Sequence, residues 1–132
     1  FGGGLSLAAA ISSSGLAAWL GDAMGGLAGL PVLAVVTAAT LGMIFLTELT
    51  SNTASAATFL PVGGAVALAI GVEPALLAVP LALAASCAFM LPVATAPNAI
   101  AYSSGLLTLK RMLAVGFGLN VAAIVLIMTF AT

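Results

Sequence analysis

Small polar side chains gather at one point of an otherwise apolar stretch, between residues 47 and 53. Thr47 and Ser51 are four residues apart, so on a helix their hydroxyls project from one face toward the same point. Asn52 and Thr53 follow where a second helix would begin, and the free N–H groups of its first turn favour an anion. Hydroxyl, amide and main-chain oxygens are also the ligands that a hard cation such as sodium requires. The cluster therefore predicts a site for a cation, an anion or both.

A second interruption lies in the apolar run 74–102, at residues 91–98. Pro92 and Pro97 remove two main-chain donors, and Pro97 disfavours helix at Ala96, so the helix is expected to break there. Irregular main chain at membrane depth is tolerated only where protein buries it or where it lines a cavity. In secondary transporters, broken helices present half-helix N-termini to anionic groups and unwound carbonyls to coupling ions. The pair of interruptions predicts one shared binding site.

The rest of the composition is that of a membrane domain. The chain has 132 residues, 64% of them hydrophobic and 4% charged, and its mean hydropathy is +1.38. These values lie far from those of a soluble domain with a polar shell, so we expect an all-α integral membrane protein in a lipid bilayer. A formal net charge of −1 leaves no basic surface, and no nucleic-acid partner is expected. Cys87 is the only cysteine, which excludes an internal disulfide and a cysteine-based metal cluster.

We expect four segments along the chain. Residues 1–30 form the end of a spanning helix followed by an interfacial amphipathic helix, in which Trp19 lies at headgroup level. The remaining segments are a helical hairpin over residues 31–72 with the polar cluster at its tip, a discontinuous transmembrane helix over 73–105 broken at 91–98, and a final transmembrane helix over 106–132. Asn120 in the final helix is expected to hydrogen-bond a neighbouring helix. Because the sequence shows no initiator methionine, charged n-region or cleavage site, we expect it to begin inside a longer chain.

At its two polar motifs the sequence resembles the divalent-anion/sodium symporter family, whose members carry citrate, succinate and related dicarboxylates, or sulfate. The resemblance runs through most of the chain and is most specific at the Ser-Asn-Thr triplet of residues 51–53 and at Leu-Pro-Val-Ala-Thr-Ala-Pro-Asn of residues 91–98. The glycine-rich opening at residues 1–4 and the Ser-Gly-Leu-Ala stretch at 14–17 also look familiar from the second repeat of that family. The chain departs from the family at Ala96, where many members have a second proline. This difference bears on which anion is carried.

The resemblance implies that the chain is the second inverted repeat of an elevator-type transporter, with a re-entrant helical hairpin and a discontinuous transmembrane helix. In such a protein a sodium ion would be held by Thr47, Ser51, Asn52 and main-chain oxygen near Ala94. A substrate carboxylate would contact Asn52, Thr53 and Thr95, with position 96 (Ala96) beside it. The first sodium site and half of the substrate site would come from the missing N-terminal repeat of the same chain. The whole protein would be a homodimer, passing several times through the cell (inner or plasma) membrane.

Several alternatives stay open. The cluster at 47–53 could be a polar turn between two ordinary spanning helices, and the prolines could mark a simple kink. Glu48 either accepts a proton and couples transport to protons, or is a structural carboxylate satisfied by neighbouring donors. Sodium-coupled transport of a succinate- or citrate-class anion is the main prediction, with sulfate or proton-coupled anion transport and a channel or structural subunit as alternatives. An enzyme such as a serine hydrolase using Ser51 or Ser86 is not expected, because the chain has no histidine and no lysine near either serine in sequence.

Overall fold

The computed structural model describes residues 2–23, 26 and 29–131, and it is built from helices. The described part contains seven α-helices: α1 (Gly2–Ser13), α2 (Leu16–Ala23), α3 (Val32–Thr47), α4 (Asn52–Ala69), α5 (Ala75–Ala84), α6 (Ala96–Ser103) and α7 (Leu109–Ala131). This architecture agrees with the expected all-α class. Of the expected segments at the two ends of the chain, residues 1, 24–25, 27–28 and 132 lie outside the described residues.

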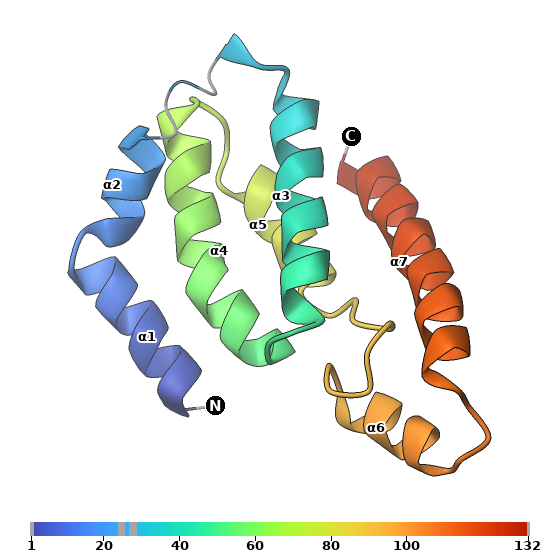
Figure 1. The fold of residues 1–132 in the computed structure, drawn as a ribbon. Helices are drawn as coiled ribbons and strands as arrows, with labels where there is room; N and C mark the ends of the chain where they lie inside the picture. The colour runs from blue at the N-terminus through green and yellow to red at the C-terminus, as the bar shows by residue number, and fades with distance from the viewer. Residues whose placement is uncertain (1, 24–25, 27–28, 132) are drawn as a thin grey trace.

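The helices form one bundle around α4 and α5. α3 and α4 run side by side in opposite directions and are joined by a tight turn (Figure 1). α1 and α2 pack along α4, whereas α5 packs against α3, α4 and α7. The turn between α3 and α4 and the non-helical segment after α5 lie toward the same end of the bundle (Figure 1). The topology therefore places the two interruptions of the sequence near each other.

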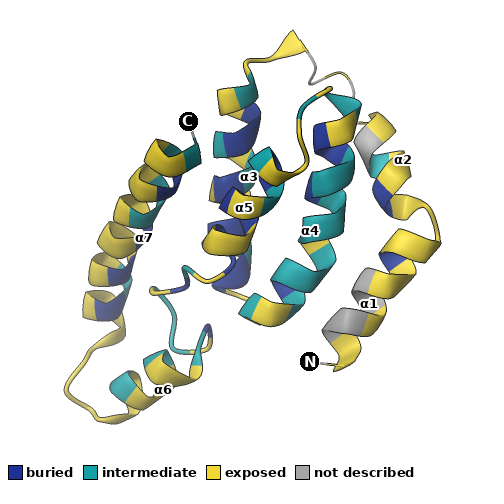
Figure 2. Ribbon diagram, turned by 180° about the vertical axis from the view of Figure 1, so that it is seen from behind, coloured by how far each residue is buried: buried dark blue, intermediate teal, exposed yellow. Residues whose placement is uncertain are grey.

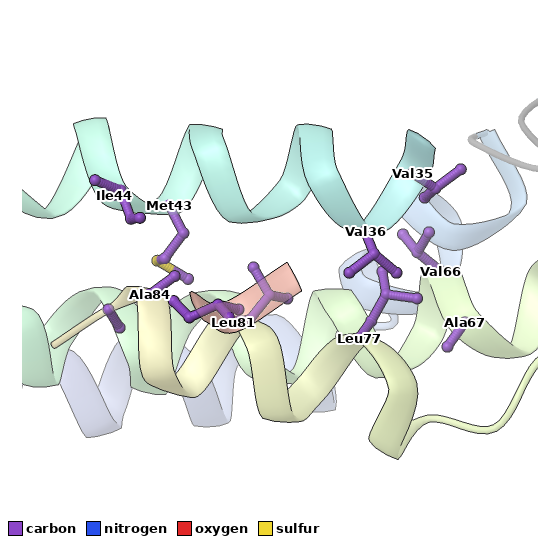
Figure 3. Close-up of a cluster of buried hydrophobic side chains, with 11 residues drawn as sticks. Val35, Val36, Met43, Ile44, Val66, Ala67, Leu77, Leu81 and Ala84 are labelled. Atoms are coloured by element: carbon purple, nitrogen blue, oxygen red, sulfur yellow. The ribbon is translucent and has the colours of Figure 1, made fainter. Parts of the chain in front are cut away.

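The buried core lies between α3, α4 and α5 (Figure 3). It combines Val35, Val36, Met43 and Ile44 of α3 with Leu77, Leu81 and Ala84 of α5 and with Val66 and Ala67 of α4. The spacings on α3 and α5 are those of a single helix face. Gly63 lets α4 approach α5 closely, because a Cβ there would overlap Leu81 Cδ1. Small residues at such crossings are how helices pack in lipid, where no water drives them together.

Only some of the described helices are long enough to cross a bilayer. α7 has 23 residues and is the one helix of the described part that meets both the length and the composition of a membrane span. Its outer face is exposed and apolar, as Val115, Phe117 and Leu126 illustrate (Figure 2). α3 has 16 residues and α5 has 10. At about 1.5 Å per residue they fall short of a hydrocarbon core of about 30 Å.

The interruption after α5 differs in its bounds from the one expected at 91–98. α5 ends at Ala84 and α6 begins at Ala96, so the non-helical segment covers residues 85–95. Pro97 lies in the first turn of α6, where its missing N–H costs nothing, and so it starts a helix instead of ending one. Thr95 caps the same helix, and its Oγ1 accepts a hydrogen bond from Asn98 N at 3.3 Å. We call residues 85–95 the unwound segment.

Candidate functional site

The end of α3 meets the end of α5 at Thr47. Thr47 is fully buried, and its Oγ1 lies 3.0 Å from the main-chain oxygen of Ala85 and 2.6 Å from Asn52 Oδ1. A hydroxyl has one hydrogen, so Thr47 can donate to only one of these two acceptors at a time. Three oxygens from three segments therefore converge on a single proton. Hydroxyl, amide and carbonyl oxygens together are a donor set suited to a hard cation.

The turn that joins α3 to α4, residues 48–51, is stabilised by hydroxyl contacts. Thr50 Oγ1 donates to Leu46 O at 3.0 Å and lies 2.5 Å from Ser55 Oγ. Ser51 is the N-cap of α4, yet its side chain makes no capping hydrogen bond. Both Ser51 and Thr53 are exposed. The first-turn N–H groups of α4 consequently have no side-chain cap, and with the helix dipole they favour an anion in front of them.

Two side chains satisfy the main chain of the unwound segment. Asn98 Nδ2 donates to Ala88 O at 2.9 Å and to Leu91 O at 3.0 Å. The N–H groups of residues 89–91 donate to the carboxylate of Glu48. Main-chain groups away from water need hydrogen-bond partners. Here the Asn98 amide donates to main-chain oxygens, and the Glu48 side chain accepts from main-chain N–H groups. The segment is thus held in a fixed non-helical conformation.

Glu48 is buried, with 3% of its surface exposed, and every group that contacts its carboxylate is a donor. Oε1 accepts from Phe89 N at 2.8 Å, from Met90 N at 2.9 Å and from Asn120 Nδ2 at 2.8 Å. Oε2 accepts from Met90 N and Leu91 N, both at 3.1 Å. Of the two alternatives for Glu48, this geometry favours the structural carboxylate. It also gives Asn120 the interhelical partner that the sequence predicts.

Helix α7 packs directly on the unwound segment. A Cβ at Gly116 would lie 2.6 Å from Met90 Cα and would overlap the main-chain oxygen of Phe89. Asn120 lies one helical turn further along and reaches Glu48. On one face of α7, Gly116 therefore packs against the unwound segment, and Asn120 contacts the Glu48 side chain to which that segment is bonded.

The structure brings together some of the predicted site residues and leaves others apart. Thr47 and Asn52 contact each other. Ala94 is buried in the unwound segment, with its N–H donating to Leu91 O at 3.2 Å, and Ala96 is exposed at the start of α6. Among the described residues no hydrogen bond joins Ser51 or Thr53 to residues 94–96. The roles expected for these residues stay predictions.

Sequence reasoning missed the Ala85 carbonyl and the partners of Glu48. A main-chain oxygen carries no sequence signal, and the first N–H partner of Glu48 lies 41 residues further along the chain. The one sequence feature that points to this part of the molecule is the polar cluster at residues 47–53. Across the described ranges, no three His, Cys, Asp or Glu side chains come together.

A separate cavity of about 480 Å³ lies between α3, α4 and α5. Its lining is apolar, with Val35, Phe59, Val66, Leu77 and Leu81 among its residues, and it includes none of the predicted ion or substrate ligands. A dicarboxylate or sodium ion would lose its hydration there without gaining a partner. The cavity is therefore not the candidate site.

Comparison with known proteins gives a consistent result. The family model for the sodium:sulfate symporter transmembrane region matches residues 1–132. The sodium-dependent dicarboxylate transporter SdcS of Staphylococcus saprophyticus subsp. saprophyticus is 50% identical over 127 residues, which are 96% of this chain and 24% of that protein. SdcS of Staphylococcus aureus (strain USA300) is 50% identical over 129 residues, 97% of this chain and 25% of that protein. The chain thus spans about a quarter of the length of these relatives.

Proposed function

Since the chain belongs to the sodium:sulfate symporter family, we propose that it is part of a sodium-coupled secondary transporter for a small di- or tricarboxylate. Relatives at 50% identity bear the name of sodium-dependent dicarboxylate transporters, which favours a dicarboxylate over sulfate as substrate. The function is that of a carrier and not of an enzyme. Sodium is the coupled ion.

One observation carries the proposal: two interrupted helices meet through polar oxygens in an apolar bundle. Thr47 at the end of α3 contacts both Asn52 at the start of α4 and Ala85 at the end of α5. A polar turn in water would leave Thr47 exposed, whereas it is fully buried. Buried oxygens that share one proton are what a weakly hydrated site for a small cation needs.

The residue roles follow from this meeting point. We assign sodium to Thr47, Ser51, Asn52 and the main chain near Ala94, with Ala85 O as the hydrogen-bond acceptor that orients the Thr47 hydroxyl. When Thr47 donates to Ala85 O, its lone pairs are free for the cation.

The substrate carboxylate is assigned to the start of two helices. Asn52 and Thr53 open α4, and Thr95 and Ala96 open α6. The first-turn N–H groups of α4 have no side-chain cap, whereas in α6 Pro97 has no N–H and Thr95 Oγ1 already accepts from Asn98 N. α4 therefore offers free donors, and the dipoles of both helices favour the negative charge. Sodium beside the carboxylate would strengthen its binding, which is how the two solutes would be coupled.

The larger assembly belongs to the same proposal. It comprises a re-entrant hairpin from α3 and α4, a discontinuous helix from α5 and α6, a missing N-terminal repeat of inverted topology and a homodimer that works as an elevator. The lengths of α3 and α5 support the first two parts, because neither helix reaches across a bilayer by itself. The whole protein would cross the cell membrane several times.

The test is uptake of labelled succinate by the full-length protein in proteoliposomes. Uptake is expected to need sodium on the outside, and Asn52→Ala is expected to abolish it, because the amide serves both solutes. Ser12→Ala, an exposed substitution on α1, is the control and should transport like the wild type. Unlabelled citrate and sulfate as competitors would rank the anions. Uptake that ignores sodium, or that survives Asn52→Ala, would contradict the proposal.

A further inference from the structure

We infer that Glu48 is a positioning residue of the sodium site: its side chain accepts hydrogen bonds from the unwound segment and holds that segment beside the turn between α3 and α4. The inference rests on the proposed function, because it concerns the same site. It assigns Glu48 no ligand role and no transported proton.

Hydrogen-bond donors surround the side-chain oxygens of Glu48. Four donor groups contact them, namely three main-chain N–H groups of residues 89–91 and the Asn120 amide, at 2.8 to 3.1 Å. Oε1 accepts from Phe89 N, Met90 N and Asn120 Nδ2, and Oε2 accepts from Met90 N and Leu91 N. Glu48 therefore ties the end of α3 to the unwound segment and to α7.

The same contacts fix the geometry of the site. Glu48 is the C-cap of α3, and the N–H groups that it accepts lie four to six residues after Ala85. Thr47 and Ala85 are therefore held together in two ways: by their own hydrogen bond, and by the hydrogen bonds between Glu48 and the unwound segment. Asn120 ties α7 to this arrangement. Loss of the carboxylate would release the unwound segment from the hairpin tip.

Glu48→Gln in the full-length protein tests the inference. Glutamine keeps the size but replaces one acceptor oxygen with an NH₂ group, which would face a main-chain N–H. The sodium concentration for half-maximal succinate uptake is expected to rise about tenfold, the size of effect of one buried hydrogen bond left unmade. Amide hydrogen exchange of residues 89–91 in the purified protein is expected to accelerate by about the same factor. A residue needed only for folding would lower the amount of active protein without moving the sodium dependence.

Two further variants make the result decisive. Glu73→Gln is the same substitution at an exposed carboxylate and should change neither readout. Asn120→Leu keeps Glu48 and its three main-chain donors but removes the fourth donor, the Asn120 amide. A smaller rise in the sodium concentration for half-maximal uptake, about threefold, is therefore expected. If Glu48→Gln does not fold, Asn120→Leu tests the inference by itself. Normal sodium dependence and normal exchange in Glu48→Gln and Asn120→Leu would overturn the inference while leaving the proposed function intact. Wild-type uptake that ignores sodium would overturn both.

Discussion

Gly116 of α7 packs directly against the main chain at Met90, and a Cβ at position 116 would lie 2.6 Å from the Met90 Cα. The contact joins the last helix to the unwound segment at its centre. Backbone on the far side cannot rotate away as a side chain can, so the space is available only to glycine.

Gly116→Ala is expected to destabilise the protein and to impair transport. Alanine gains about 1 kcal/mol over glycine in a helix interior, but overpacking costs about 1–3 kcal/mol, and here the obstacle is main chain. The net effect should be a lower melting temperature of the purified protein. Gly118→Ala on the same helix is the matched control, because a Cβ there meets no atom within 4 Å. A melting temperature for Gly116→Ala equal to that of Gly118→Ala would show that α7 does not pack on the unwound segment.

Asn98→Asp should disrupt the unwound segment without changing side-chain size. The Asn98 amide donates to Ala88 O and Leu91 O, and a carboxylate in its place would face two carbonyl oxygens. Leaving buried acceptors without a donor costs about 1–3 kcal/mol each. We expect a lower melting temperature and loss of succinate uptake. Ser103→Ala, an exposed change on α6, should alter stability by no more than about 0.5 kcal/mol; an Asn98→Asp variant equally mild would contradict the bridging role.

Much of this arrangement could be predicted from the sequence. The polar cluster at 47–53 and the prolines at 92 and 97 identified two interruptions, because polar groups and missing donors are conspicuous in an apolar chain. Asn120 was likewise predictable as an interhelical partner. The bounds of the unwound segment were not predictable, since Pro97 is equally compatible with ending a helix and with starting one.

The contacts that close the site depend on tertiary structure. Whether Glu48 is structural or a proton carrier could not be decided from the sequence. Its partners are main-chain N–H groups of the unwound segment, and these are available to a side chain only because α5 ends at Ala84. The role of the Ala85 oxygen is hidden for the same reason. The pattern of polar and apolar residues shows where polar side chains lie, but it does not show which main-chain carbonyl groups lack a partner within a helix.

Thr40→Val is expected to stabilise the protein. Thr40 is fully buried in α3, and its Oγ1 has no hydrogen-bond partner among the described residues. Valine has nearly the same shape without the unsatisfied hydroxyl, so the free energy of unfolding should rise by about 1 kcal/mol. Thermal unfolding in detergent would measure it. Thr37→Val serves as the comparison, since the Thr37 hydroxyl donates to Leu33 O at 2.6 Å and its loss should bring no such gain; a lower melting temperature for Thr40→Val would mean that its hydroxyl has a partner.

The central claim is that oxygens at the junction of α3, α4 and α5 bind sodium, and equilibrium binding of radioactive sodium to the purified full-length protein tests it most directly. Thr47→Val removes the hydroxyl that contacts Asn52 and Ala85, whereas Thr37→Val makes the same change on the same helix away from the junction. The account predicts that Thr47→Val binds less sodium than the wild type at every concentration, and that Thr37→Val binds the wild-type amount. Identical binding curves for Thr47→Val and the wild type would contradict it.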